Sequence, residues 1–177
     1  MGGRSRSLRF AALKCLLGYL FSWVNNVNIL YILETGDTHV MTAYFDYSHT
    51  VTEQDIDELG HAGNFHYIKW MQHAAIAHSS ANGWPAHRYY ELGAGWVVRS
   101  HNITYLKQAF LGDSVVIKTW IASGKTASCV RCYEIVNDKG EMLAKAETVW
   151  AFVNYEKQNP TRIPPEVMAC FEIVGEL

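Results

Sequence analysis

The hydrophobic period of the sequence changes at Asn64, and this change limits the possible folds more than any other feature. Residues Ala43 to Thr52 form a short aromatic and β-branched run typical of a strand, whereas Asn64 to Asn82 have helical spacing. Asn64 is a candidate N-cap of this helix, and Gly83 and Pro85 mark its far end. The pattern predicts a strand that leads through a turn into a helix of about five turns.

Four strand candidates follow the helix. Each is rich in Val, Ile, Thr, Tyr and Trp, and short connections containing glycine separate them. They are Trp96 to Ala109, Ser114 to Ala122, Thr126 to Val136 and Glu141 to Tyr155. In the last of them Ala144, Ala146 and Thr148 fall on one face while Lys145 and Glu147 fall on the other, as in a sheet with one covered side. The connections predict hairpins, so we expect an antiparallel four-strand meander.

A strand, a long apolar helix and a meander pack most simply when a curved sheet wraps the helix. One face of the helix carries Tyr67, Met71, Ala74 and His78, and Ile76 extends the apolar surface, so we expect protein on most sides of it. The predicted fold class is α+β, with a long central helix wrapped by a curved antiparallel sheet of about five strands.

Composition limits the partners and the location. With 177 residues, of which 49% are hydrophobic and 18% charged, the chain can bury one sizeable core, and residues 41–177 are expected to form a single domain. The net charge of -2 offers no broad basic field for a nucleic-acid backbone, so nucleic acid is not expected as a partner. Four scattered cysteines do not suggest a disulfide framework, which favours a reducing, cytoplasmic location. Cys129 and Cys132 would point to opposite faces of a strand, so no metal site is expected from them.

Residues 1–40 differ in kind from the rest of the chain. Three arginines precede an apolar run from Phe10 to Val24, which Lys14 interrupts. The segment is a signal peptide, a membrane anchor or translated upstream DNA ahead of a start at Met41. No small-x-small site closes the run, and its polar interruptions break the ~20 apolar residues that a span needs. We therefore favour the start-site interpretation, and expect membrane contact only if this extension belongs to the native protein.

The turn ahead of the helix carries the most specific motif of the sequence. Its spacing is Asp-x-Asp-x-x-Gly-His-x-x-Asn-x-x-Tyr-x-x-Trp, formed by Asp55, Asp57, Gly60, His61, Asn64, Tyr67 and Trp70. The motif resembles that of hotdog-fold thioesterases of the 4-hydroxybenzoyl-CoA thioesterase and acyl-ACP thioesterase type. Two later stretches, Thr104 to Asp113 and Asn159 to Pro165, also resemble this family. The resemblance covers about Thr42 to Pro165 and implies the hotdog fold.

The resemblance implies a thioesterase in which Asp57 is the catalytic carboxylate. Thioester hydrolysis needs a base that activates water or a carboxylate that attacks the carbonyl, and an aspartate beside a helix start can do either. The amides from Gly60 to about Asn64 are candidate donors to the developing oxyanion, since the helix dipole is positive there. Gly60 would also let substrate approach the backbone closely, as a substrate-binding residue.

Three other side chains of the motif have two interpretations each. His61 positions the water or the thioester carbonyl, or else it is a structural turn residue. Asn64 takes part in the reaction or caps the helix. Tyr67 is a core residue or a wall of the acyl pocket, and Asp55 and Trp70 are expected to be structural.

Two other functions compete with thioester hydrolysis. Hydratases and dehydratases of the hotdog fold resemble one another in that a histidine is paired with an acidic residue on or near the central helix. In this chain residues 65–82 contain no Asp or Glu to serve as that acidic residue. A protein that binds an acyl thioester without cleaving it would not need Asp57. The prediction is therefore hydrolysis of an acyl-CoA or acyl-ACP thioester to a free acid and a thiol, without a cofactor. The resemblance also implies a homodimer or homotetramer, while acyl chain length and the choice of thiol carrier stay open.

Overall fold

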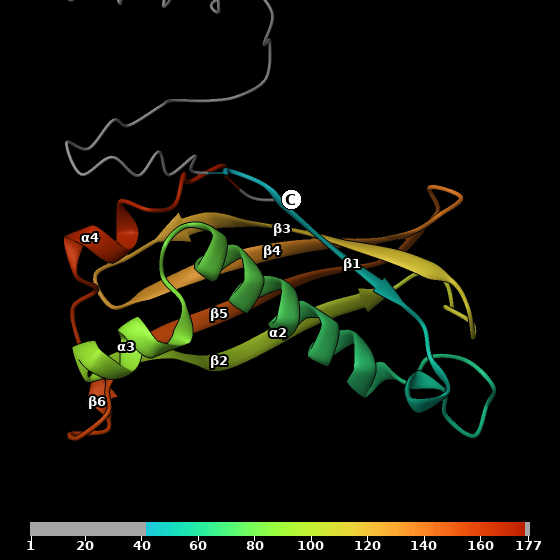
Figure 1. Ribbon diagram of the computed structural model, residues 1–177, viewed down its shortest axis with the longest axis horizontal. Coiled ribbons are helices and arrows are strands. Elements are labelled where there is room, and N and C mark those ends of the chain that lie inside the picture. Colours follow the sequence, from blue (N-terminus) through green and yellow to red (C-terminus); the bar gives the residue numbers. More distant parts are fainter. Residues whose placement is uncertain (1–41, 176–177) are drawn as a thin grey trace, which may run out of the picture.

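A curved antiparallel sheet and a long helix across its concave face make up the fold (Figure 1). The computed structural model describes residues 42–175. In chain order the elements are β1 (Phe45–Thr50), the 3-10 helix η1 (Glu53–Asp55), α2 (Asn64–Ala81), α3 (Ala86–Leu92), β2 (Ala94–Tyr105), β3 (Ser114–Gly124), β4 (Ser128–Asn137), β5 (Met142–Asn154), β6 (Asn159–Pro160) and α4 (Pro165–Met168). The predicted α+β hotdog architecture is confirmed, with five long strands and the two-residue β6 beside β5.

The expectations for residues 1–40 lie outside the described residues. Within residues 42–175, no helix combines the length and the apolar character that a membrane crossing requires.

The predicted four-strand meander is wrong in its first strand. The sheet order is β1-β3-β4-β5-β2, so only β3, β4 and β5 succeed one another as hairpins. β2 pairs with β5 at the far edge, where Trp96 lies opposite Phe152, and β1 pairs with β3. Residues 106–113 therefore cross the end of the sheet instead of forming a hairpin. Their reach of ~3.3 Å per residue is ample, because the three strand spacings to be crossed total ~14 Å.

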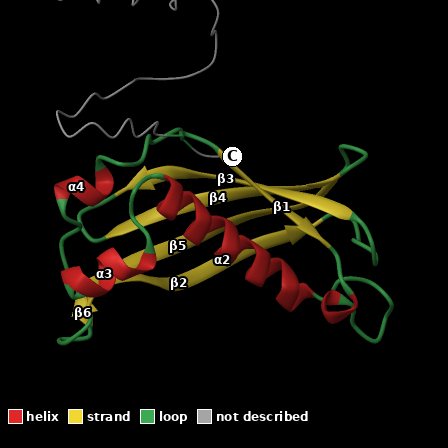
Figure 2. Ribbon diagram, viewed as in Figure 1, coloured by secondary structure: helices red, strands yellow, loops and turns green. Residues whose placement is uncertain are grey.

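Register shifts in three strands bend the sheet around α2 (Figure 2). They fall at residues 98–100 of β2, at 121–123 of β3 and at 142–144 of β5, opposite residues 135–136 of β4. A bulge adds an unpaired residue on one strand and increases the local bend and twist. The shifts thus explain how the sheet curves around one helix.

The apolar face of α2 packs on the sheet, as predicted. Tyr67, Met71 and Ala74 are at most 2% exposed and share a core cluster with Ile117 of β3. Ile76, by contrast, is 56% exposed. The expectation of protein on most sides of α2 is therefore wrong at this position, because the described chain covers the helix from the sheet side only.

The first residue of α2 differs in role from the prediction. The helix begins at Asn64 itself, and Gly63 occupies the N-cap with φ -68° and ψ 148°, without a side-chain cap. The interpretation of Asn64 as the N-cap is wrong. At the other end Asn82 is the C-cap and Gly83 has a φ of +83°, close to the predicted stop. The helix α3 is not predicted by the sequence pattern, because seven residues span too few turns to establish a helical period.

The cysteines of β4 lie on opposite faces of the sheet, as predicted. Cys132 packs with Trp120 and Ala122, whereas Cys129 packs with Ile121 and Phe171. Burial raises the pKa of the Cys129 thiol to about 11, so this side chain is a neutral, small hydrophobe. In the part of the chain that the structure describes, no three His, Cys, Asp or Glu side chains are placed to hold a metal ion.

A buried polar network ties the second half of α2 to the sheet. Arg131 Nη1 donates to His78 Nδ1 at 2.9 Å and to Thr119 Oγ1 at 3.2 Å. Since arginine only donates, His78 Nδ1 must carry the lone pair, and Nε2–H donates to the Thr42 carbonyl at 2.9 Å. Burial, assisted by the charge of Arg131, lowers the pKa of His78 to about 4. His78 is therefore a neutral ring at physiological pH.

We expect His78 to make the fold less stable as the pH falls from 7 to 5. Its pKa is near 6.5 in the unfolded chain and about 4 in the fold, so the unfolded chain binds the proton first and gains stability as acid is added. The loss in unfolding free energy down to pH 5 should be about 2 kcal/mol. Urea unfolding at both pH values measures it, and His78→Gln should remove most of this dependence. An unchanged dependence in the variant would contradict the neutral ring.

Candidate active site

Backbone hydrogen bonds within the motif shape the turn that precedes α2. The amide of Asp57 donates to the His61 carbonyl at 2.9 Å, and the amide of Gly60 donates to the Asp57 carbonyl at 3.0 Å. Gly60 has a φ of +79°, which a side-chain-bearing residue rarely adopts, so the turn itself requires glycine. The Gly63 amide donates to the Asp55 carbonyl at 2.9 Å. This last hydrogen bond joins the start of the turn to Gly63, the N-cap of α2.

Asp55 anchors this turn from inside. It is 3% exposed, and its Oδ2 accepts from the Thr52 amide and hydroxyl, both at 2.8 Å, and from His49 Nε2 at 3.0 Å. Its Oδ1 accepts from Trp70 Nε1 at 3.3 Å, and His66 Nδ1 lies 3.1 Å away. Burial pushes the pKa of Asp55 upward, but the hydrogen bonds from Thr52 and His49 outweigh it and hold the pKa well below its ordinary value. The contacts suit the structural role expected for Asp55.

Asp57 has one carboxylate oxygen engaged and one available. Its side chain is 37% exposed, and Oδ1 accepts the Leu59 amide at 2.9 Å and lies 3.8 Å from His61 Nδ1. Oδ2 has no hydrogen-bond partner among residues 42–175. A Cβ placed on Gly63 would lie 3.4 Å from Oδ2, so the carboxylate adjoins the N-cap of α2. A carboxylate oxygen without a partner among these residues thus lies near the positive end of the helix dipole.

A cavity of about 500 Å³ at the start of α2 brings three of the predicted site residues together. Its wall consists of His61, Ala62, Asn64, Tyr67, Tyr105, Leu106, Lys107, Gln108, Phe110 and Glu141. Asp57 and Gly60 lie outside this lining, although Asp57 adjoins it through His61. Residues 105–110, which lie in a stretch that resembles the family, form one side of this wall.

His61 and Asn64 both have polar atoms available in this cavity. His61 Nδ1 lies 3.3 Å from the Ala62 carbonyl, which can only accept, so the neutral ring carries its lone pair on Nε2. The Asn64 side chain, relieved of capping, has no hydrogen-bond partner within residues 42–175. Its backbone carbonyl accepts from the Tyr105 hydroxyl at 3.3 Å. A lone pair and a free amide therefore face the same space.

Tyr67 combines the two roles that its position in the motif allowed. It is 2% exposed and lies edge-to-face with Tyr105, at a centroid distance of 5.2 Å, while its ring is 4.8 Å from that of Trp70. Burial raises the pKa of Tyr67, so the phenol stays protonated. Tyr67 is a core residue that also forms part of the cavity wall.

Of the backbone amides from Gly60 to Asn64, which the sequence predicts as oxyanion donors, only some are free to donate. The amides of Gly60, Ala62 and Gly63 already donate to carbonyls at 2.8 to 3.0 Å. The amides of His61, Asn64 and Phe65 have no partner in the described part of the chain, which for the last two is usual in the first turn of a helix. The candidate oxyanion donors are therefore the His61 amide and the first turn of α2.

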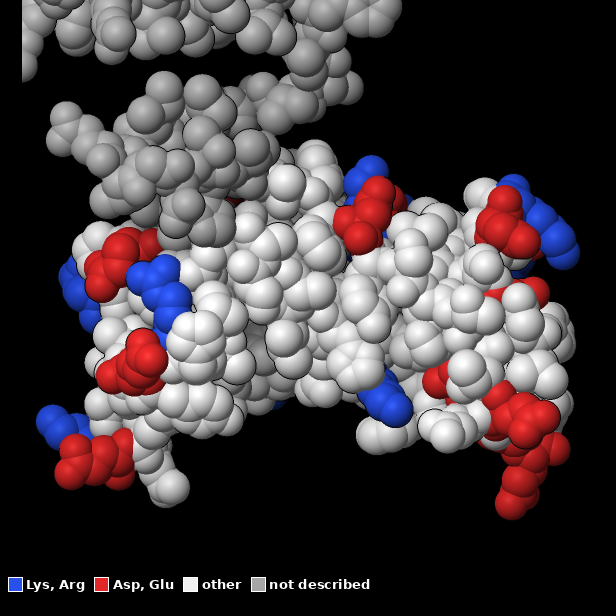
Figure 3. Space-filling model, viewed as in Figure 1, with Lys and Arg blue, Asp and Glu red and all other residues white. Residues whose placement is uncertain are grey.

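Charge around the site is mainly acidic. Figure 3 shows acidic side chains at the end of the molecule that holds the loop before α2, and a largely uncharged surface over the middle of that face. Lys107 is the one Lys or Arg among the residues lining the cavity, and Glu141 holds it at 2.6 Å. The cavity therefore suits an uncharged thioester better than a phosphate group.

Gly63 is a position of the candidate site that the sequence did not reveal. A Cβ on this residue would lie 3.3 Å from the Cβ of Asp57 and 3.4 Å from its Oδ2. The absence of a side chain therefore leaves the space that Asp57 occupies. No pattern in the sequence marks this, because the close approach depends on the folded turn.

We expect Gly63→Ala to lower kcat for thioester hydrolysis about ten-fold and to change KM little. The φ of -68° suits alanine, but the added methyl must push Asp57 aside by a few tenths of an ångström, and a displacement of ~1 Å can cost ~100-fold in rate. Steady-state kinetics measure the effect, and thermal unfolding should show a loss of about 1 kcal/mol or less. Parent activity in this variant would mean that the position of Asp57 is not critical.

The fold is that of solved thioesterases. A DHNA-CoA thioesterase from Staphylococcus aureus superposes with a TM-score of 0.65 and 24% identity over 67% of this chain and 80% of that chain. A putative oleoyl thioesterase from Lactobacillus plantarum superposes with a TM-score of 0.70 and 22% identity over 76% of this chain and 53% of that chain. At such identities the likeness establishes the hotdog fold.

The family follows from the sequence of the domain. Residues 42–171 match the model of the acyl-ACP thioesterase N-terminal domain, so the chain belongs to the acyl-ACP thioesterase family. A chloroplastic palmitoyl-acyl carrier protein thioesterase of Cuphea hookeriana is 31% identical over 101 residues, which are 55% of this chain and 24% of that protein. An acyl-carrier-protein hydrolase of Cuphea viscosissima is 33% identical over 75 residues, 41% of this chain and 18% of that protein. The chain thus spans a quarter or less of the length of these relatives.

Proposed function

We propose that this chain hydrolyses an acyl thioester, of CoA or of acyl carrier protein, to a free acid and a thiol. The observation that carries the proposal is the free Oδ2 of Asp57 at the positive end of α2, next to a cavity lined by His61, Asn64 and Tyr67. Membership of the acyl-ACP thioesterase family supports the same reaction. The names of the relatives, one an acyl-ACP and another an acyl-CoA thioesterase, leave both carriers open.

Asp57 acts through Oδ2 by one of two routes. As a general base it takes a proton from water, whose oxygen bonds to the thioester carbon; the C–S bond then breaks and the departing thiolate is protonated. As a nucleophile, Oδ2 itself bonds to the carbon and expels the thiolate, and water hydrolyses the resulting anhydride. The routes differ in whether Asp57 forms an anhydride with the acyl group, which gives a test.

The first turn of α2 stabilises the oxyanion that both routes generate. The free amides of Asn64 and Phe65 are fixed donors at the positive helix end, and the Asn64 side chain adds a third donor facing the cavity. His61 Nε2 accepts a hydrogen bond from the attacking water and so positions it. Tyr67 forms the apolar wall against which the acyl group lies.

A second copy of the chain is proposed to complete the site. The open edge of β2 is twelve residues long, and such an edge is a template for pairing. Large apolar side chains are exposed near the cavity, among them Leu59 at 79%, Phe65 at 70% and Leu106 at 52%, as at an interface.

We expect this chain to sediment as a dimer or tetramer, and not at the 20.1 kDa of one chain. Pairing of the β2 edges would satisfy the free backbone groups of two protomers at once. Sedimentation velocity at micromolar concentration measures the mass. A species with the single-chain mass at all concentrations would contradict the assembly.

Thiol release from a panel of substrates tests the reaction itself. The panel contains short, medium, long and aromatic acyl-CoAs, each with the matching acyl-ACP, and Asp57→Asn serves as the blank. We expect saturable release from at least one series. Saturable binding of a thioester without release would instead favour the acyl-binding alternative, and loss of water from a hydroxyacyl thioester would favour the dehydratase.

A further inference from the structure

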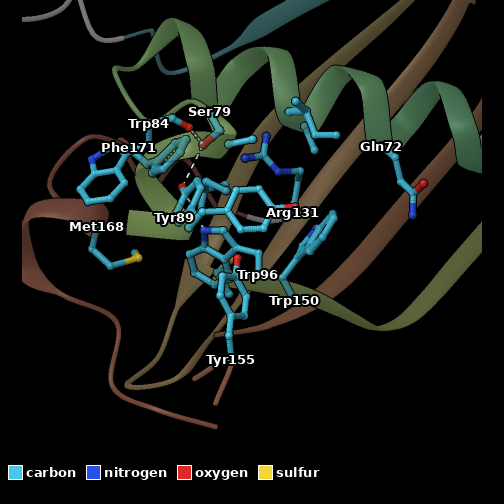
Figure 4. Close-up of a pocket in the computed structure, with 16 residues that line it drawn as sticks. Gln72, Ser79, Trp84, Tyr89, Trp96, Arg131, Trp150, Tyr155, Met168 and Phe171 are labelled. Atoms are coloured by element: carbon cyan, nitrogen blue, oxygen red, sulfur yellow. Dashed lines mark hydrogen bonds between the residues drawn. The ribbon is translucent and has the colours of Figure 1, made fainter. Parts of the chain in front are cut away.

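A second cavity, of about 370 Å³, lies along the second half of α2 (Figure 4). It shares no lining residue with the candidate active site. On α2 the nearest lining residues of the two cavities are Tyr67 and Gln72, which are ~7.5 Å apart along the helix. Its wall is mainly aromatic and includes Trp84, Tyr89, Trp96, Trp150 and Phe171. This size falls within the ~300–1,000 Å³ range of small-molecule pockets.

The hydroxyl groups of Ser79 and Tyr89 in this wall are already hydrogen-bonded within the protein. Trp96 Nε1 donates to the Tyr89 hydroxyl at 3.2 Å. Ser79 Oγ donates to the Trp84 carbonyl at 2.8 Å, so the Tyr89 hydroxyl must be the donor in its 2.9 Å bond to Ser79 Oγ. Each proton in this chain has an acceptor within the protein. These three groups therefore offer no proton to a ligand, whereas the buried Trp150 Nε1 of the same wall has no hydrogen-bond partner among the described residues.

Arg131 is the cation of this cavity, and its charge is not compensated. The side chain lines the cavity, and the residue is 4% exposed. Figure 4 shows its guanidinium beneath α2, between the helix and the aromatic side chains. No carboxylate of residues 42–175 forms an ion pair with it, and no Lys, Asp or Glu lines the cavity. A buried charge is costly unless it is paired, so Arg131 lacks a counterion at this site.

The partners that Arg131 has are neutral and occupy one nitrogen. Nη1 donates to His78 Nδ1 and to Thr119 Oγ1, while Nη2 and Nε have no acceptor among the described residues. His78 supplies no negative charge, because its ring is neutral. A guanidinium presents two parallel N–H groups that match the two oxygens of a carboxylate. The missing partner is therefore an anion of this shape.

We propose that this cavity binds an apolar monocarboxylate, with its carboxylate on Arg131 and its hydrocarbon body against the aromatic wall. A phosphate group fits the site less well, since it brings about two negative charges to one cation. Two sources have this chemistry: linear alkanoates, such as a thioesterase would release, and arylalkanoates. The proposal concerns binding alone and holds whether or not the chain hydrolyses thioesters.

Titration of the full chain with matched acids and alcohols tests the site. The linear arm compares octanoate with octan-1-ol, and the aromatic arm compares 4-phenylbutyrate with 4-phenylbutan-1-ol. Calorimetry gives the affinities, and emission of Trp84, Trp96 and Trp150 reports occupancy of this cavity. We expect the acid of at least one arm to bind about ten-fold more tightly than its alcohol. Whichever acid binds more tightly, octanoate or 4-phenylbutyrate, shows whether the ligand is a linear alkanoate or an arylalkanoate.

Two variants locate the carboxylate. Arg131→Met should lower acid affinity about ten-fold and leave alcohol affinity within about two-fold, while circular dichroism checks its fold. Arg131→Lys keeps the charge in case the methionine variant does not fold, and should retain part of the preference. Arg88→Met is the matched control, because Arg88 lies outside the cavity with its guanidinium 4.3 Å from the Trp84 ring centroid.

Three outcomes would overturn the proposal. The first is equal binding of acids and alcohols by the parent chain. The second is no binding of either arm. The third is loss of the acid preference in Arg88→Met but not in the Arg131 variants, which would place the carboxylate at the surface.

Discussion

Replacing Asp57 by asparagine is expected to lower kcat for thioester hydrolysis about a thousandfold while the fold stays intact. Asparagine retains an Oδ1 that can accept the Leu59 amide, so the turn should survive. The substitution removes the negative Oδ2, which both proposed routes require as base or nucleophile. Steady-state thiol release measures the effect, with unfolding curves to compare stability.

A neighbouring carboxylate provides the matched control for this test. Glu58 is exposed in the same turn and has no place in the proposed site, so Glu58→Gln should keep parent activity within about two-fold. Equal rates in Asp57→Asn and the parent would remove Asp57 from the mechanism. A single turnover in ¹⁸O-labelled water then tests the nucleophile route in the parent. Label in the Asp57 carboxylate requires an anhydride that water opens at the Asp57 carbon, whereas a base, or an anhydride opened at the acyl carbon, places the label in the acid.

Replacing Asp55 by alanine is expected to lower the free energy of unfolding by about 3 kcal/mol. The reason is that one buried carboxylate serves the Thr52 amide and hydroxyl, His49 Nε2 and Trp70 Nε1, and its removal leaves all four donors without this acceptor. Urea unfolding at pH 7 measures the change. Asp57→Ala, which removes an exposed carboxylate from the same turn, should cost about 1 kcal/mol or less. Equal costs at the two positions would contradict the anchoring role.

The pH dependence of the Asp55 contribution has a defined direction. The pKa of Asp55 in the fold lies below its ordinary value of 3.8, so the fold holds the ionised form more strongly than the unfolded chain does. The stabilisation is fully present above pH 4 and is lost as the pH falls below it. This window lies below the one for His78, and unfolding curves between pH 7 and pH 3 should separate the two.

Much of the fold could be predicted because its signals are local. The helix over Asn64–Ala81 and the strands β3 to β5 appear in the sequence as periods of 3.6 and 2, which depend on neighbours a few residues away. The position of β2 could not be predicted in this way. The segment between β2 and β3 has the composition of a hairpin turn, yet β2 pairs with β5. That pairing depends on how strands far apart in the sequence pack together.

The site could be predicted as a set of residues but not as a geometry. The motif spacing alone indicates Asp57, His61, Asn64 and Tyr67, and the fold places the last three around one cavity. Spacing could not show that Asn64 is freed from capping by Gly63, because both residues are plausible caps. The catalytic roles of these side chains stay proposals until the variants are measured.

By itself the sequence determined the long helix, the five long strands, the motif ahead of α2 and the family, because periodicity and fixed spacing are properties of a short stretch of chain. Only the tertiary structure decided which oxygen of Asp57 is free, which amides remain unpaired, and that Arg131 is buried without a counterion among residues 42–175. These depend on groups brought together from distant parts of the chain: Arg131 and His78 are 53 residues apart and 2.9 Å from nitrogen to nitrogen. Such contacts result from the packing of the whole sheet on α2, and no local pattern encodes them.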